Sequence, residues 1–84
     1  MFKVKIHVVP KKSIADPQGS AVKDALGTIG FSGIEELRIG KIVEIKLDVS
    51  NRKNAEIMIK EMCEKLIVNP LIEEYSFEFV EESI

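Results

Sequence analysis

The 84-residue sequence has few of the residue types and motifs that most enzymes use for catalysis. It contains one cysteine, Cys63, one histidine, His7, and no tryptophan. A single cysteine cannot form an intrachain disulfide, and the sequence has no Cys-x-x-Cys motif or Cys/His cluster to hold a metal. We therefore expect no metal site, and Cys63 is typical of a protein in a reducing compartment.

Long apolar runs and a strong net charge are also missing. No run approaches the roughly 20 apolar residues that cross a bilayer, and the N-terminus alternates lysine with apolar residues where a signal peptide has a continuous apolar block. The net charge of −2 gives no general attraction to nucleic acid or to an anionic membrane. We expect a cytoplasmic protein that binds neither membranes nor nucleic acids.

Catalytic motifs are absent as well. The sequence has no Gly-x-Gly-x-x-Gly, no phosphate-binding glycine loop and no Gly-x-Ser-x-Gly. His7 lies among lysines with no acidic or nucleophilic neighbour in the sequence, and adjacent acidic pairs such as Glu73-Glu74 point to opposite faces of a strand. The sequence therefore predicts no catalytic residues and no cofactor bound by this chain.

What is present indicates one small folded domain that spans residues 1–84. The sequence is 45% hydrophobic and 31% charged, which is typical of a soluble globular domain. A domain of this size buries only about 60–65% of the surface that its unfolded chain exposes. Self-association would therefore help to stabilise it.

The first half of the sequence predicts a strand and a helix. Residues 2–9 alternate apolar and polar side chains, which indicates a half-buried strand. Asp16 and Pro17 begin a helix over residues 17–29, and Gly30 fits the left-handed residue that ends it. Gly19 in its first turn costs about 1 kcal/mol relative to alanine. Either Gly19 is a tolerated weakness, or another surface approaches the backbone closely there.

The second half predicts two further strands, a helix and a last strand. Strands over residues 34–39 and 43–49 flank Gly40-Lys41, and the register favours a three-residue turn or a bulge between them. Asn69-Pro70 ends the second helix, and residues 72–80 form the last strand. The second helix begins at Ser50 or Asn51, runs to about Leu66 and is expected to bury Ala55, Met58, Ile59, Met62 and Leu66, with Cys63 beside them.

The element order predicts an α+β fold. Two strand-helix-strand units, residues 2–39 and 43–80, have nearly equal lengths. Their natural closure is a split β-α-β (ferredoxin-like) two-layer sandwich, with an antiparallel four-stranded sheet in the order 4-1-3-2 and two helices on one face. The other face then faces water or a partner chain, and it carries Lys3, Lys5, His7, Glu44, Lys46, Glu74 and Glu78.

Three ordered blocks of the sequence resemble one family. The first is Asp16-Pro17-Gln18-Gly19 with Gly30-Phe31, the second is Arg38-Ile39-Gly40-Lys41, and the third is the segment from Glu64 to Tyr75 around Asn69-Pro70. Together they are similar to PurS, the small subunit of phosphoribosylformylglycinamidine (FGAM) synthase. The sequence differs from the family at Ile67-Val68, where Leu-Ala-like residues are expected. This difference gives no reason to doubt the chemistry that the resemblance implies.

The resemblance implies a non-catalytic subunit of an ATP- and glutamine-dependent ligase of purine biosynthesis. Its implied partners are a glutaminase subunit, a large synthetase subunit that uses ATP and Mg, and further copies of itself, as a homodimer or a dimer of dimers. In this family the small subunit bridges the other two while ammonia passes from glutamine to formylglycinamide ribonucleotide. Candidate partner contacts are Asp16, Pro17, Gln18, Gly19, Arg38, Lys41, Asn69, Pro70, Ile72, Glu73 and Tyr75.

Two other functions fit a domain of this shape. An ACT-like regulatory module would bind an amino acid between paired copies. A small enzyme such as an acylphosphatase is disfavoured, because no phosphate-binding loop with its arginine follows the first strand.

Overall fold

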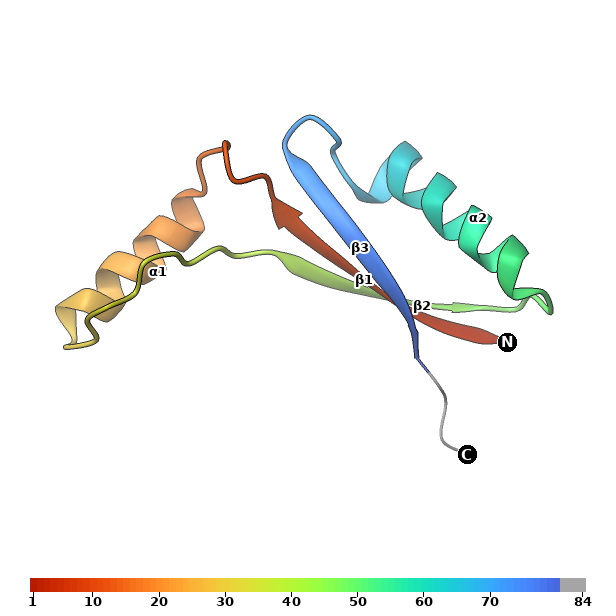
Figure 1. The fold of residues 1–84 in the computed structure, drawn as a ribbon, viewed down its shortest axis with the longest axis horizontal. Helices are drawn as coiled ribbons and strands as arrows, with labels where there is room; N and C mark the ends of the chain where they lie inside the picture. Colours follow the sequence, from red (N-terminus) through yellow and green to blue (C-terminus); the bar gives the residue numbers. More distant parts are fainter. Residues whose placement is uncertain (81–84) are drawn as a thin grey trace.

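The computed structural model describes residues 1–80 as three strands and two α-helices, the second of which continues into a short π-helix (Figure 1). In chain order the elements are β1 (Phe2–Pro10), α1 (Pro17–Thr28), β2 (Lys41–Leu47), α2 (Arg52–Met62), the π-helix η1 (Cys63–Ile67) and β3 (Glu73–Val80).

The three strands form one antiparallel sheet in the order β2-β1-β3. Ile6 in the central strand lies opposite Val43 of β2 and Phe77 of β3, so apolar residues from all three strands share one face. This order agrees with the expected positions of the first, third and fourth strands. The α+β class with an antiparallel sheet and two helices is confirmed.

The hydrophobic core lies between this face and α2. Val4, Ile6 and Val8 of β1 are almost completely buried, as are Ala55 and Ile59 of α2. Aromatic side chains close one end of the core, where Phe2 of the central strand and Phe79 of β3 meet edge to face with ring centroids 5.6 Å apart. One helix therefore provides most of the second layer.

The expected strand over residues 34–39 is wrong, and so is its turn at Gly40-Lys41. β2 begins at Lys41, directly opposite Val8, so residues 34–40 continue past the end of β1 and have no neighbouring strand within the described chain. They run as an extended segment beside α1 (Figure 1). We call residues 16–40 the α1 arm.

The expectation that both helices cover one face of the sheet is also wrong. The α1 arm projects away from the sheet, and Gly19 is the only buried residue of α1 (Figure 1). The radius of gyration is 16.4 Å, against about 12 Å for a compact chain of this length. The protein is therefore a half-covered sheet with a projecting helical arm.

The end of α2 also differs from the expected pattern. Cys63 is fully buried in the core, whereas Leu66 is exposed and Met58 is partly exposed. The helix widens into η1 at Cys63, and the extra residue per turn rotates the following side chains away from the 3.6-residue stripe. This widening explains why Leu66 is not buried as expected.

Candidate functional site

The base of the α1 arm is held by the carboxylate of Asp16. One oxygen, Oδ1, accepts a hydrogen bond from the backbone N–H of Gly19 at 3.1 Å, which caps α1. The other, Oδ2, accepts from the backbone N–H of Ile39 at 3.0 Å. Asp16 therefore joins the start of the helix to the extended segment that returns beside it.

Gly19 is required by a close approach within this chain. A Cβ built on Gly19 would lie 2.8 Å from the carbonyl oxygen of Leu37 and would also collide with the Asp16 carboxylate. The surface that approaches the backbone is therefore the returning segment of the arm. A large substitution at Gly19 would displace that segment before it affected any partner chain.

Arg38 connects the arm to β3. Its Nη2 atom lies 3.6 Å from a carboxylate oxygen of Glu74, and its Nε atom lies 4.0 Å from Glu36. Nη2 is buried and has no hydrogen-bond partner within the described chain. The two hydrogen bonds to the Asp16 carboxylate, with a smaller contribution from the Arg38 charge, lower the pKa of Asp16 below its usual value.

A tight turn around Asn69 forms the corner between η1 and β3. The Asn69 side chain accepts a hydrogen bond from the Leu71 N–H at 3.2 Å, and the Asn69 N–H donates to the Glu73 carboxylate at 2.8 Å. Lys11 then donates its backbone N–H to the carbonyl of Ile72 at 2.9 Å, which ties this corner to the end of β1.

The structure brings the two sequence-predicted stretches together. Gln18 of the arm, Lys41 of β2 and Glu73 of β3 line one cavity of about 180 Å³ where β1 ends and the other two strands begin. Pro70, Glu73 and Tyr75 line a second cavity of about 240 Å³ beside it. We call this region the arm-base surface, and its residues are Asp16, Pro17, Gln18, Gly19, Arg38, Lys41, Asn69, Pro70, Ile72, Glu73 and Tyr75.

Cys63 and Tyr75 both line the second cavity. Burial, and secondarily the negative charge of Glu64, raises the pKa of the Cys63 thiol and of the Tyr75 phenol. A raised pKa keeps the thiol protonated and weakly nucleophilic near neutral pH. Among residues 1–80 no group of three or more His, Cys, Asp or Glu could hold a metal ion.

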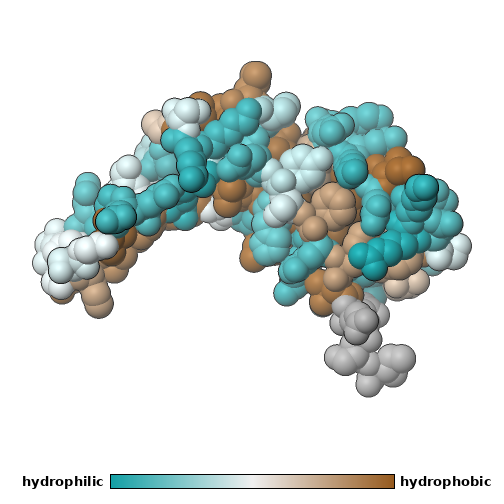
Figure 2. Space-filling model, viewed as in Figure 1, coloured by the Kyte–Doolittle hydropathy of each residue, from teal (hydrophilic) through white to brown (hydrophobic). Residues whose placement is uncertain are grey.

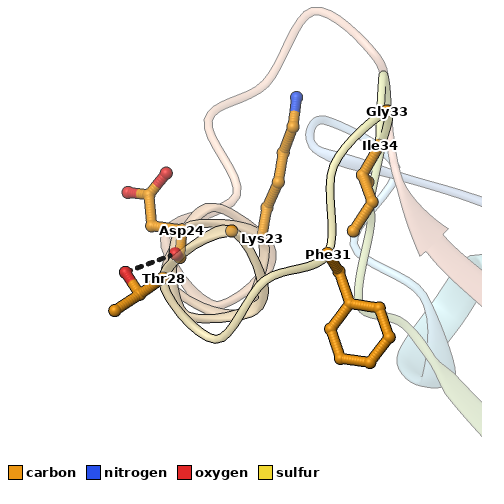
Figure 3. A pocket seen from close by; sticks show the side chains of 7 residues that line it. Lys23, Asp24, Thr28, Phe31, Gly33 and Ile34 are labelled. Atoms are coloured by element: carbon orange, nitrogen blue, oxygen red, sulfur yellow. Dashed lines mark hydrogen bonds between the residues drawn. The ribbon is translucent and has the colours of Figure 1, made fainter.

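Sequence reasoning missed two exposed apolar regions. At the corner, Leu66 and Leu71 are 87% and 81% exposed. At the tip of the arm, Ile29 and Phe31 are exposed, and Phe31 lines a groove of about 520 Å³ between α1 and the returning segment (Figure 3). The Lys23 ammonium spans this groove and donates to the Glu35 carbonyl at 2.8 Å. Only the fold could show that the rest of the described chain does not cover these apolar side chains.

The open face of the sheet carries the expected row of charges. Lys5 lies 3.9 Å from Glu44, and the His7 ring lies 3.5 Å from Glu78. His7 thus has an acidic partner that is 71 residues away in the sequence. Both pairs are substantially exposed, so each contributes little to stability.

The structure defines a small α+β domain with an antiparallel sheet, two helices and one projecting arm (Figure 1). Solved structures share this arrangement. PurS from Bacillus subtilis superposes with a TM-score of 0.85 and 44% identity over 96% of this chain and 100% of that chain. The matching chain of PurLQS from Thermotoga maritima has a TM-score of 0.86 and 30% identity over 94% of this chain and 96% of that chain.

Sequence comparison identifies the family. The PurS family model, described as phosphoribosylformylglycinamidine (FGAM) synthase, matches residues 3–81. The PurS subunit of Bacillus subtilis strain 168 is 45% identical over all of this chain and 98% of its own length. The chain belongs to the PurS family of FGAM synthase subunits, which serve purine biosynthesis as part of a ligase complex. No helix within residues 1–80 has the length and apolar content to cross a membrane.

Replacing Asp16 with asparagine should test the link at the arm base. Asparagine offers one acceptor oxygen instead of two, so one of the two backbone hydrogen bonds is lost. Because folding lowers the pKa of Asp16, its stabilising effect is full above about pH 4 and is lost as pH falls through the folded pKa.

Chemical denaturation of both proteins between pH 2 and pH 7 measures this effect. The wild type should be more stable than Asp16→Asn at pH 7, and the two should converge at the acidic end. Asp24→Asn, on the exposed side of α1, is the matched control and should show no such convergence. A constant difference between wild type and Asp16→Asn at every pH would contradict the role of the charge.

Proposed function

We propose that this chain is a non-catalytic subunit that holds the glutaminase and synthetase subunits of FGAM synthase together. It would support the transfer of ammonia from glutamine to formylglycinamide ribonucleotide while the large subunit binds ATP and Mg. The expected setting is the cytoplasm, and the expected form is a homodimer or a dimer of dimers.

The observation that carries this proposal is the convergence of three segments at the arm base. Gln18, Lys41 and Glu73 come from the arm, β2 and β3, and they form one continuous surface beside the exposed Leu71. Such a surface offers apolar area with a polar rim, which is the usual composition of a protein interface. The solved PurLQS chain from Thermotoga maritima supports a place in a multi-subunit complex.

The physical need for such a subunit follows from the chemistry of ammonia. Free ammonia in neutral water is protonated and loses its nucleophilicity. Two active sites that exchange it must therefore be held in a fixed orientation with water excluded between them. A small subunit can meet this need through its surfaces alone.

Reconstitution of the synthase with and without this chain tests the proposal. Omitting the chain should lower glutamine-dependent amidation at least about tenfold, in keeping with the loss of a positioned reactant. Glutaminase and synthetase should also no longer elute as one complex. Unchanged activity and unchanged complex size on omission would refute the bridging role.

Lys41→Glu places a reversed charge on the arm-base surface, and it should weaken assembly. The matched control is Lys53→Glu, which makes the same change on an exposed position of α2 away from this surface. Equal assembly of both variants would remove the arm-base surface from the proposed interface.

A further inference from the structure

The second cavity of the arm-base surface has an apolar floor and an acidic rim. Cys63 and Val68, which are 0% and 4% exposed, line it together with Pro70 and Tyr75. The remaining lining residues are three glutamates, Glu64, Glu73 and Glu74. Within residues 1–80, no lysine, arginine or histidine lines this cavity. It therefore combines an apolar interior with charge of a single sign.

The three carboxylates of the rim differ in their partners. Glu73 accepts a hydrogen bond from the backbone of the corner at 2.8 Å, and Glu74 lies 3.6 Å from Arg38. Glu64 forms no ion pair with any other residue of the described chain. A cleft lined by one sign of charge concentrates the field of that charge and attracts a counter-ion. The rim therefore lacks one positive charge, and the lack is greatest at Glu64.

The negative charge of Glu64 reaches the floor of the cavity. After burial, it is the next cause of the raised pKa of the Cys63 thiol and of the Tyr75 phenol. A cation placed among these groups would oppose that effect. The geometry of the lining and the electrostatics of its floor thus favour the same kind of occupant.

The size of the cavity suits one long side chain. Its volume is about 240 Å³, whereas pockets for small molecules usually have about 300–1,000 Å³. Tryptophan, tyrosine and arginine are the side chains that most often fill pockets at protein interfaces. Of these, only arginine neutralises an acidic rim. Its guanidinium can bind carboxylates and also stack on an aromatic ring such as that of Tyr75.

Exposed apolar side chains lie in the same two segments as the lining residues. Leu66 of η1 is 87% exposed, and Leu71 and Ile72 of the corner are 81% and 43% exposed. Figure 2 shows apolar surface at this corner, at the top of the view. Contacts of this kind around a pocket exclude water and strengthen the polar interaction within it. The surroundings of the cavity therefore have the composition of a docking site.

A second copy of this chain does not offer a free arginine. The sequence contains two arginines, Arg38 and Arg52. Arg38 lies beside Glu74 of its own chain. Arg52 lies 3.6 Å from Glu56, and its guanidinium carbon is 4.4 Å from the centre of the Phe79 ring. An arginine that enters the second cavity must therefore come from a different protein.

We infer that the second cavity receives an arginine side chain from another subunit of the synthase. This inference rests on the bridging role proposed above and specifies the chemistry of one contact. The guanidinium pairs with the Glu64 carboxylate at the rim, and the aliphatic stem packs on Val68 and Tyr75. Leu66 and Leu71 pack on the apolar surface around that arginine.

Removal of one charge tests this contact in the assembled synthase. Glu64→Gln keeps the shape of the side chain but removes its charge, and it should weaken binding to the other subunits at least about tenfold. The matched control is Glu61→Gln, one turn earlier on an exposed position outside the cavity, and it should bind as the wild type does. Titration of each labelled chain into a mixture of the other subunits, followed by fluorescence anisotropy, measures the affinity. Equal affinity of Glu64→Gln and the wild type would overturn the inference.

A pair of probes tests the chemistry of the cavity itself. N-acetyl-arginine amide at millimolar concentration should shift the backbone amide NMR signals of Cys63, Val68 and Tyr75. The citrulline analogue has nearly the same shape without the charge and should leave them unmoved. Equal shifts with both probes, or none with either, would contradict an arginine site.

Two further outcomes separate this inference from the bridging role. If the arginine probe binds but Glu64→Gln assembles normally, the cavity takes a free guanidine compound, and docking of a subunit there is refuted. The omission assay compares the synthase with and without the whole chain and does not depend on Glu64. Loss of this one contact would therefore leave the bridging role intact.

Discussion

Replacing Ile59 with alanine is expected to lower the free energy of unfolding by about 3 kcal/mol, within the range found for large-to-small changes in cores. Ile59 is 0% exposed and is among the largest completely buried side chains of the protein. It lies in the centre of α2, the main cover of the sheet, so few neighbours can move to fill the cavity. The total free energy of unfolding of a domain of this size is about 4–13 kcal/mol, so a loss of about 3 kcal/mol is a large part of it.

Ile57→Ala is the matched control for this prediction. It makes the same chemical change on the same helix, but Ile57 is 51% exposed. Its effect should stay within about 0.5 kcal/mol, as for most surface substitutions. Urea denaturation at one fixed chain concentration measures both variants, since self-association would make stability depend on concentration. Equal losses for the two variants would show that α2 does not form the core as described.

The second large effect is expected at Gly40. Its Cα faces the Val8 carbonyl of β1, and a Cβ there would collide with that backbone oxygen and lie 2.9 Å from the Val9 side chain. Because the obstacle is backbone inside a paired strand, it cannot move aside without breaking the ladder between β1 and β2. Gly40→Ala should therefore lower the free energy of unfolding by about 2 kcal/mol, the usual magnitude for overpacking.

Gly27→Ala provides the contrast. Gly27 lies within α1, and apart from its chain neighbours and the backbone of its own helix no atom lies within 4 Å of a Cβ built there. Alanine at this position should raise stability by about 0.5–1 kcal/mol through helix propensity alone. Thermal unfolding of both variants at equal concentration separates the two cases. A Gly40→Ala protein as stable as the wild type would show that the arm does not leave the sheet through this close contact.

Local signals in the sequence predicted the ends of α1 well. Asp16 caps the helix as expected. Gly30 has a φ of 107°, and the N–H groups of Gly30 and Phe31 donate to the carbonyls of Gly27 and Leu26. These bonds complete the expected helix end. Caps depend on residues within a few positions of each other, so the sequence alone contains the necessary information.

Pairing between distant segments was less predictable. Residues 34–39 are extended, as their pattern suggests, but they pair with no strand in the described chain. An extended segment becomes a strand only when another backbone lies beside it, and that depends on where the arm is directed. The contacts that direct the arm join Asp16 to Ile39 and Gly40 to Val8, and no local pattern reveals them.

The candidate surface was likewise predictable in its local signals and unpredictable in its long-range contacts. The sequence indicated the two stretches that meet at the arm base, through Gly19 and through Asn69-Pro70. It could not show that Arg38 ties one stretch to Glu74 in the other, or that Leu71 is left exposed beside them. Those features exist only once β1 and β3 are paired.

The central claim is that this chain contributes surfaces, and not catalytic groups, to the synthase. The most direct test is to drive the amidation with a high concentration of ammonium chloride in place of glutamine, with this chain omitted. We expect the ammonia-dependent rate to stay within about twofold of that of the complete complex, because no transition-state contact is removed. A loss of the ammonia-dependent rate as large as the loss of the glutamine-dependent rate would contradict it and would place part of the chemistry in this chain.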